Sequence, residues 1–326
     1  MKKKILITGS NGLLGQKIIY GLLGDPLCLI SDELRKKINN EVEIIATARG
    51  KNRLSRKDGY IYESLDITNK SEVENVFAKY NPNIIINTAA MTNVDACETK
   101  REECRQTNVI AVQNIVEAIQ NPKSKIQNCH FIHLSTDFVF DGTKGGPYNE
   151  NDKPNPLHYY ALSKLEGEKI VMASKIRWAI IRTIIIYGVV DDMSRSNIVL
   201  WTKNSLEKGQ KINVVNDQFR SPTLAEDLSQ GCILAAMKSA EGIYHISGKD
   251  ILNIIDMVYT IADFWKLDKS FINPVSSEEL HQPAKRPLYT GFILDKARKE
   301  LGYNPRSFIE GLKIVDGQLK KYIVSS

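Results

Sequence analysis

The sequence predicts an α/β protein built on a Rossmann-type, doubly wound parallel sheet with a smaller C-terminal lobe. An apolar run at residues 4–8 leads directly into three glycines spaced three apart, Gly9, Gly12 and Gly15. Apolar strand-like runs then alternate with helix-like runs, which is typical of a parallel sheet covered by helices on both faces. After residue 188 the alternation becomes irregular, which indicates a second unit.

The expected strands are continuous runs of Ile, Val and Leu, as in strands buried on both faces. They cover residues 4–8, 43–47, 60–65, 83–87, 129–135 and 178–183. Helices are expected at residues 12–23, 70–80, 101–119 and 159–174. We interpret residues 25–40 as an insertion with its own helical turn.

The C-terminal part combines short strands with longer helices. Its expected elements are a helix at 198–208, strands at 211–215 and 242–246, and helices at 252–264 and 308–322. We therefore divide the chain into a dinucleotide-binding domain, residues 1–188, and a substrate-binding lobe, residues 189–326. Segments of the lobe are expected to return to the first domain.

Composition excludes several classes of protein. The net charge of +6 is mild for 326 residues, and its spread along the chain favours solvated faces over nucleic-acid binding. Five irregularly spaced cysteines predict reduced thiols in a cytoplasmic protein. No apolar run approaches the ~20 residues of a membrane span, and the first residues read as a strand rather than a signal peptide. The five scattered histidines have no metal-ligand spacing, so no metal site is expected.

The glycine turn predicts a site for a phosphate-bearing ligand, with a plain turn as the alternative. Gly9 allows the tight exit from the strand, and Gly12 lets the backbone approach a pyrophosphate. Gly15 lets the following helix pack closely on the sheet. The free N–H groups at the helix N-terminus would then hold the negative charge.

The end of the second strand decides between the two nicotinamide cofactors. A carboxylate commonly stands there in NAD sites, but this chain has Arg49, followed by Lys51 and Arg53. An arginine pairs well with a 2′-phosphate, so NADP(H) is favoured and NAD(H) stays possible. The alternative is a solvated basic turn.

Two further strand ends belong to the expected cofactor site. Asp66 closes the third strand, where it would accept from the adenine amino group while the backbone at Ile67 bonds the ring. Capping of the next helix is an equally good explanation of Asp66. Ala89 and Ala90 follow the fourth strand, where small residues leave room for the nicotinamide half.

A tyrosine and a lysine indicate the chemistry. Tyr160 and Lys164 are four residues apart and share one helix face. An ammonium beside a phenol is expected to lower the pKa of the phenol, which makes it a proton donor or acceptor. Thr136, at the end of the fifth strand, would hydrogen bond the same substrate oxygen. Spacing alone does not exclude Tyr159 in place of Tyr160.

In this combination the chain resembles the extended short-chain dehydrogenase/reductase superfamily, and within it the dTDP-4-dehydrorhamnose reductases. The resemblance spans nearly the whole chain. It is carried by residues 7–15, Asn87-Thr88-Ala89-Ala90, Ser135-Thr136-Asp137-Phe138-Val139-Phe140-Asp141-Gly142, Tyr160-Ala161-Leu162-Ser163-Lys164, Arg182-Thr183, Ser221-Pro222-Thr223 and Arg286-Pro287. It implies that Thr136, Tyr160 and Lys164 form a catalytic triad.

The roles of these residues follow from the resemblance. Tyr160 would donate a proton to the reduced carbonyl oxygen, Lys164 would bind the nicotinamide ribose, and Thr136 would orient the carbonyl. The expected cofactor-binding residues are Gly9, Asn11, Gly12, Leu13, Gly15, Arg49, Asp66, Ile67, Ala89, Ala90, Tyr160 and Lys164. The expected substrate-binding residues are Asp137, Arg220 and Arg286, the two arginines as diphosphate ligands or as members of surface salt bridges.

The resemblance implies NADPH-dependent reduction of a 4-keto nucleoside-diphosphate sugar, with dTDP-4-dehydrorhamnose as the leading substrate and a homodimer as the expected assembly. Ile185 replaces the tryptophan that commonly lines the sugar site in these reductases, so the sugar stays open. One alternative is another enzyme of the superfamily, such as an epimerase or a dehydratase. The other is a non-catalytic NADP-binding subunit like the regulatory subunit of methionine adenosyltransferase.

Overall fold

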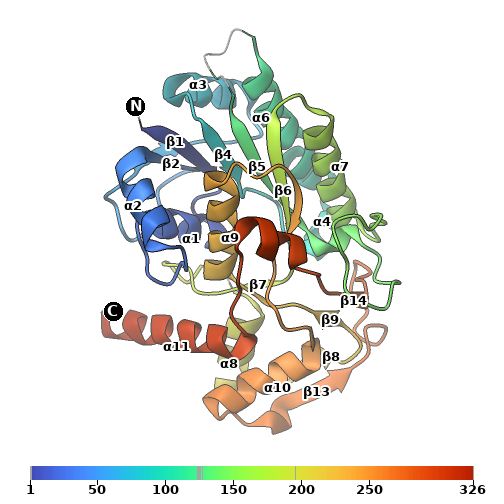
Figure 1. The fold of residues 1–326 in the computed structure, drawn as a ribbon. Helices are drawn as coiled ribbons and strands as arrows, with labels where there is room; N and C mark the ends of the chain where they lie inside the picture. Colours follow the sequence, from blue (N-terminus) through green and yellow to red (C-terminus); the bar gives the residue numbers. More distant parts are fainter. Residues whose placement is uncertain (1, 123–125, 127, 195, 326) are drawn as a thin grey trace.

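The computed structural model describes residues 2–122, 126, 128–194 and 196–325. Its centre is a seven-stranded sheet with the order β11-β6-β5-β4-β1-β2-β3, in which every pairing is parallel (Figure 1). The strands are β1 (Lys3–Thr8), β2 (Val42–Ala48), β3 (Ile61–Ser64), β4 (Ile84–Asn87), β5 (His130–Thr136), β6 (Arg177–Thr183) and β11 (Gly242–His245). The strand order reverses between β1 and β4, as in doubly wound folds. The predicted fold class is confirmed.

Alternate side chains of each strand face two separate cores. Ile5 and Ile7 of β1 pack with α1 (Leu13–Leu22) and α9 (Ala225–Met237), whereas Leu6 packs with α3 (Lys70–Tyr80) and α6 (Ala111–Gln120). The helix α7 (Tyr159–Ala173) lies on the second side, where Val171 joins the core. Burial on both faces explains why the strands are apolar without alternation.

The helix α9 was not predicted, and its position explains why. Every residue from 225 to 236 is buried, so the segment shows no polar face and no helical period in its sequence. It packs against α1, where a Cβ on Gly21 would lie 2.8 Å from Cδ1 of Ile233. This helix leads into β11, which pairs with β6 in the main sheet.

Two expected helices differ in extent. The insertion holds a ten-residue helix, α2 (Asp32–Glu41), rather than a single turn, and Ser31 caps it by accepting from the N–H of Leu34. The helix expected at 101–119 is divided into α5 (Arg101–Arg105), a π-helical turn (Gln106–Ile110) and α6. The wider turn carries Asn108, whose side chain exchanges two hydrogen bonds with the backbone of Met91.

The C-terminal lobe has a third core of its own and lies below the sheet in Figure 1. Its long elements are α8 (Ile198–Glu207), β8 (Ile212–Val215), α10 (Ile254–Trp265), β13 (Ile272–Val275) and α11 (Phe308–Ser325). The shorter elements of the lobe are β7 (Ile186–Tyr187), β9 (Phe219–Arg220), β10 (Thr223–Leu224), β12 (Leu252–Asn253), β14 (Tyr289–Thr290), a 3₁₀ turn (Lys269–Phe271) and a second π turn (Ala297–Leu301). In the first domain, the short helix α4 (Val94–Thr99) follows β4, and another 3₁₀ turn (Asp137–Val139) directly follows β5.

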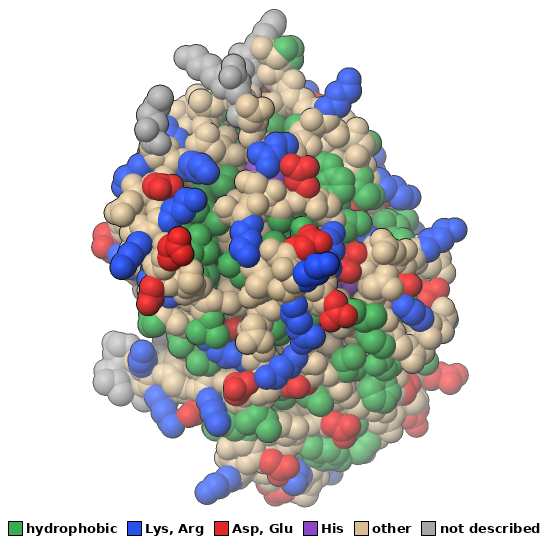
Figure 2. All heavy atoms as spheres, viewed as in Figure 1, with side chains coloured by type: hydrophobic (Ala, Val, Ile, Leu, Met, Phe, Trp, Pro, Cys, Tyr) green, Lys and Arg blue, Asp and Glu red, His purple; other side chains and the backbone are tan. Residues whose placement is uncertain are grey.

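Basic and acidic side chains are interspersed over the face shown in Figure 2. In the described part of the chain, no helix is both long and apolar enough to cross a bilayer.

A buried ion pair joins α7 to the sheet. Arg182 of β6 donates to both carboxylate oxygens of Glu168, from Nε at 2.9 Å and from Nη2 at 2.7 Å. Both side chains are buried, and the guanidinium also lies over the ring of Phe140, 5.2 Å from its centroid. This two-pronged contact sets how α7 lies on the strands.

We expect Glu168→Gln to lower the free energy of unfolding by about 3 kcal/mol, because it leaves the Arg182 charge buried without its partner. Urea unfolding at neutral pH measures this change. Glu166→Gln on the same helix is the matched control and should stay within about 0.5 kcal/mol of the parent protein. Equal stability of the two variants would contradict this role of the pair.

Candidate active site

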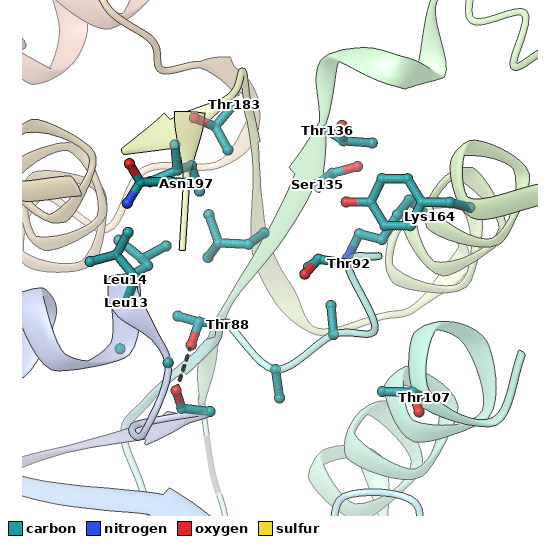
Figure 3. A pocket seen from close by; sticks show the side chains of 18 of the residues that line it. Leu13, Leu14, Thr88, Thr92, Thr107, Ser135, Thr136, Lys164, Thr183 and Asn197 are labelled. Atoms are coloured by element: carbon teal, nitrogen blue, oxygen red, sulfur yellow. Dashed lines mark hydrogen bonds between the residues drawn. The ribbon is translucent and has the colours of Figure 1, made fainter. Parts of the chain in front are cut away.

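A cleft of about 650 Å³ runs along the carboxyl ends of the parallel strands, between the sheet and the C-terminal lobe. In Figure 3, Ser135, Thr136 and Lys164 lie on one side of it, and Leu13, Leu14 and Asn197 lie on the other. Ligands of doubly wound sheets bind at this edge, where the strand order reverses. All thirteen predicted cofactor and catalytic positions line the cleft: Gly9, Asn11, Gly12, Leu13, Gly15, Arg49, Asp66, Ile67, Ala89, Ala90, Thr136, Tyr160 and Lys164.

The glycine turn is shaped for close approach of a ligand backbone. Gly9 has φ +70°, and a Cβ there would lie 2.8 Å from the nitrogen of Ala89. A Cβ on Gly15 would lie 2.4 Å from the Gly9 carbonyl oxygen, so only glycine lets α1 start this close to β1. No side chain caps the first turn of α1 and no acidic residue stands in it. The turn therefore fits a pyrophosphate, as a dinucleotide requires.

The basic loop after β2 is held against the glycine turn by Asn11. Its side chain donates to the Lys51 carbonyl at 2.9 Å and accepts from the Arg53 N–H at 2.9 Å. Arg49 and Arg53 both line the cleft, and the Arg49 side chain is 70% exposed. This loop therefore places two guanidinium groups at the cleft, next to the glycine turn.

Asp66 does not cap the helix that follows it. The cap of α3 is Asn69, which accepts from two backbone N–H groups of the first turn. Asp66 instead accepts from the N–H and the hydroxyl of Thr68 and lies 3.9 Å from Nη1 of Arg49. Of the two explanations considered from the sequence, the geometry favours a side chain that faces the cleft. The adenine contact itself stays a prediction.

Tyr160, rather than its neighbour, faces the cleft. The neighbouring Tyr159 does not line the cleft, and its ring lies under Arg101, 5.1 Å from the guanidinium carbon. His158 begins the helix by accepting from the Ala161 N–H and stacks its ring on Tyr160 at 6.0 Å. The start of α7 thereby directs the Tyr160 phenol inward.

The charge state of Tyr160 differs from the expectation. Burial, followed by the carboxylate of Asp137, raises the pKa of this phenol above its ordinary value, while a hydrogen bond with Thr136 opposes the rise. The prediction that Lys164 lowers this pKa is therefore wrong for the protein as it stands, because desolvation outweighs the effect of a neighbouring charge. Tyr160 is a protonated phenol at neutral pH and can donate its proton.

Lys164 lies under the cleft with 3% of its side chain exposed. Burial lowers the pKa of its ammonium to about 8, against the opposing charge of Glu168. Its Nζ lies 3.4 Å from Nε2 of His133, one of the five scattered histidines, for which the sequence predicted no place in the site. Nothing in the sequence pattern distinguished this histidine, because its contact depends on how α7 lies on β5.

Asp137 is buried next to Thr136 and is held by several donors. The hydroxyls of Thr136 and Thr290 donate to its two carboxylate oxygens, and Nε of Arg220 lies 3.9 Å away. Burial raises the pKa of this carboxyl, and the charge of Arg220 opposes the rise. Asp137 lines the cleft and keeps the Thr136 hydroxyl in place.

The guanidinium of Arg220 is bound by groups of the lobe and is not free to bind a ligand. Its two Nη atoms donate to the carbonyls of Phe219, Leu288 and Pro287 and to the side chain of Gln218. Every Nη hydrogen thus has a protein acceptor, so binding of a diphosphate would require these bonds to be exchanged. This geometry does not support the direct diphosphate contact expected for Arg220.

Arg286 also lines the cleft, from the C-terminal part of the chain. It forms a two-pronged ion pair with Asp95, at 3.1 and 2.8 Å. Its side chain is partly buried, at 15% exposed, so it is neither a simple surface bridge nor a free anion ligand. An anion in the cleft would share this guanidinium with Asp95.

Sequence reasoning missed several residues that line the cleft. Asn197 caps α8 and donates to the Gly188 carbonyl at 2.7 Å. An asparagine directly before the helix expected at 198–208 can be recognised in the sequence as an N-cap, but an N-cap does not indicate a cleft. The other missed lining residues are Thr92, Ser135, Gln218 and Ile254. In the described ranges no cluster of His, Cys, Asp and Glu could hold a metal ion.

Known proteins similar to this chain share both its length and its fold. Residues 2–320 match the family described as the RmlD substrate binding domain. A dTDP-4-dehydrorhamnose reductase from Aggregatibacter actinomycetemcomitans is 31% identical over 95% of this chain and 97% of its own. The beta subunit of methionine adenosyltransferase 2 from Bos taurus is 28% identical over 95% of this chain and 86% of its own.

A solved structure agrees with the fold. The dTDP-4-dehydrorhamnose reductase of Bacillus anthracis, in complex with NADP, superposes with a TM-score of 0.79 at 28% identity. The match covers 98% of this chain and all of the other.

We expect Arg49→Ala to raise the Kd of NADPH about tenfold and to leave that of NADH unchanged, because only NADPH carries a 2′-phosphate. Fluorescence titration of the two cofactors measures both constants. Arg56→Ala is the matched control, since Arg56 is in the same loop but pairs with Asp58 outside the cleft. An equal loss for both cofactors would argue against recognition of the phosphate by Arg49.

Proposed function

The chain belongs to the family of the RmlD substrate binding domain, and from this premise we propose that it reduces the 4-keto group of a nucleoside-diphosphate sugar. The leading substrate is dTDP-4-dehydrorhamnose, which would become dTDP-rhamnose. NADP(H) is the cofactor, and NADPH supplies the hydride when it is bound. The protein is accordingly assigned as an oxidoreductase of nucleotide sugars.

One observation carries the proposal: a protonated Tyr160 phenol and the Thr136 hydroxyl lie together in the cleft, with Lys164 beneath them. Tyr160 would give its proton to the carbonyl oxygen as that oxygen gains negative charge. The Thr136 hydroxyl, which donates to Asp137 in this structure, would exchange that bond for one to the same oxygen and so fix its position. The Lys164 ammonium adds a positive charge that favours the phenolate left behind.

The cofactor would be held by groups already described. The glycine turn and the start of α1 would take the pyrophosphate, and the loop of Arg49 and Arg53 would take the 2′-phosphate. Ala89 and Ala90 would leave space for the nicotinamide, and Lys164 would bond its ribose. The sugar would then lie between this half and the lobe, near Ile185 and Arg286.

A second candidate is a regulatory subunit that binds NADP without catalysis. It is favoured by the 28% identity to a methionine adenosyltransferase beta subunit over 95% of this chain. The complete set of Thr136, Tyr160 and Lys164 favours catalysis. A dehydratase is less well supported, because Phe138 stands where a dehydratase usually has a glutamate. A cytoplasmic location and a homodimer stay predictions.

We expect Tyr160→Phe to bind NADPH normally but to lose about 10²–10⁴-fold in kcat, because it removes only the proton donor. NADPH oxidation with freshly prepared dTDP-4-keto-6-deoxy sugar, with NADH in parallel, measures the rate. The control is Tyr159→Phe, one residue away and outside the cleft, which should keep full activity.

Full activity of the Tyr160 variant would overturn the role of this residue. If the parent protein binds NADPH without turning over the sugar and instead changes the rate of a methionine adenosyltransferase, the second candidate replaces the first.

A further inference from the structure

A row of buried polar side chains crosses the sheet and ends at Lys164. The Thr8 hydroxyl bonds Oδ1 of Asn87 at 2.6 Å, and Nδ2 of Asn87 lies 3.1 Å from Nδ1 of His133. Nε2 of His133 lies 3.4 Å from Nζ of Lys164. The four residues come from β1, β4, β5 and α7, and none is more than 3% exposed. The row therefore connects three strands to a residue of the cleft without contact with solvent.

The polarity of this row depends on the charge of Lys164. Burial lowers the pKa of His133 well below its ordinary value, so the ring is neutral, with one nitrogen that donates and one that accepts. An ammonium can only donate, so beside it Nε2 of His133 must accept and Nδ1 must carry the hydrogen. A neutral amine can accept, which permits the opposite arrangement.

The Asn87 amide can serve both arrangements. With Oδ1 toward Thr8, its Nδ2 donates to Nδ1 of His133, whose Nε2–H then points at an uncharged Lys164. The structure has the amide in this first orientation, and a charged Lys164 requires it turned over. Oδ1 then accepts from Nδ1–H of His133, and Nε2 accepts from the ammonium. The row transmits hydrogen-bond direction and not protons, because an amide does not ionise.

We propose that His133 is a positioning residue for Lys164. Nε2 of His133 accepts a hydrogen bond from the Lys164 ammonium and so keeps this ammonium charged and directed at the cleft. The catalytic role of this hydrogen bond rests on the proposed function, whereas the existence of the hydrogen bond does not. A close approach of α7 makes it possible, since a Cβ on Gly167 would lie 3.4 Å from Nε2 of His133.

Other groups around Lys164 do not replace this acceptor. Glu168, on the same helix, raises the pKa of Lys164 through its charge, but its carboxylate is bound by Arg182. The Cys104 thiol of α5 acts in the same direction and is bonded to Ser163. Tyr160, also on α7, is a neutral phenol that faces Thr136. Among the described residues, His133 is the side chain that lies within hydrogen-bonding distance of Nζ.

The direct test is ¹⁵N NMR of the histidine ring nitrogens in the protein without added ligands, from about pH 6 to about pH 10. The His133 signal is identified by its loss in His133→Gln. We expect a neutral ring throughout, with hydrogen on Nδ1 below the pKa of Lys164 and on Nε2 above it. One unchanged tautomer, or an imidazolium at the acid end, would overturn the proposal. No turnover is required, so this outcome is independent of the proposed function.

Variants provide the second measurement, the pH profile of kcat. His133→Leu removes the acceptor, which should lower the pKa of Lys164 and move the alkaline limb about one pH unit downward, with KM little changed. His133→Gln offers an amide oxygen to Nζ of Lys164 and should return the alkaline limb to its position in the parent protein. The control His130→Gln alters a buried histidine of β5 that bonds the Ala240 carbonyl instead. A folded His133→Leu variant with the parent limb would contradict the proposal.

Discussion

The close approach of α7 to β5 is the constraint on which the site depends. Gly167 permits it, since a Cβ there would lie 3.4 Å from Nε2 of His133 on β5 and 2.9 Å from the Asn108 carbonyl oxygen of the neighbouring π turn. The ion pair of Glu168 with Arg182 then fixes the helix against β6. Because Lys164 and Tyr160 stand on the same helix, their depth under the cleft follows from this packing rather than from their own contacts.

The site also depends on the separation of its buried charges. Asp137 is placed with Arg220 on the side of the lobe, and Glu168 is placed with Arg182 on the side of the sheet. Lys164 lies between these pairs and takes an uncharged partner, His133. A carboxylate bound directly to Lys164 would hold the ammonium more firmly but would cancel the charge that the cleft requires. A neutral acceptor leaves that charge available.

The sequence was sufficient for features that are local or periodic. The glycine turn, six strands of the sheet and the pair of Tyr160 and Lys164 were predicted because each has a signal within a few residues. The helix α9 had no such signal, since it is buried on all sides. Two of the carbonyls that restrain Arg220, those of Pro287 and Leu288, are more than sixty residues away, and the raised pKa of Tyr160 comes from packing. Neither can be inferred from spacing.

The last strand of the sheet has a consequence for how the chain is made. β11 pairs with β6 only after the intervening segment, with α8 and α9, has left the ribosome. Until then the nascent sheet ends at β6 with unpaired backbone groups, the kind of edge that recruits other strands. Synthesis of this protein therefore includes a vulnerable interval, which closes when residue 245 becomes available to complete the sheet.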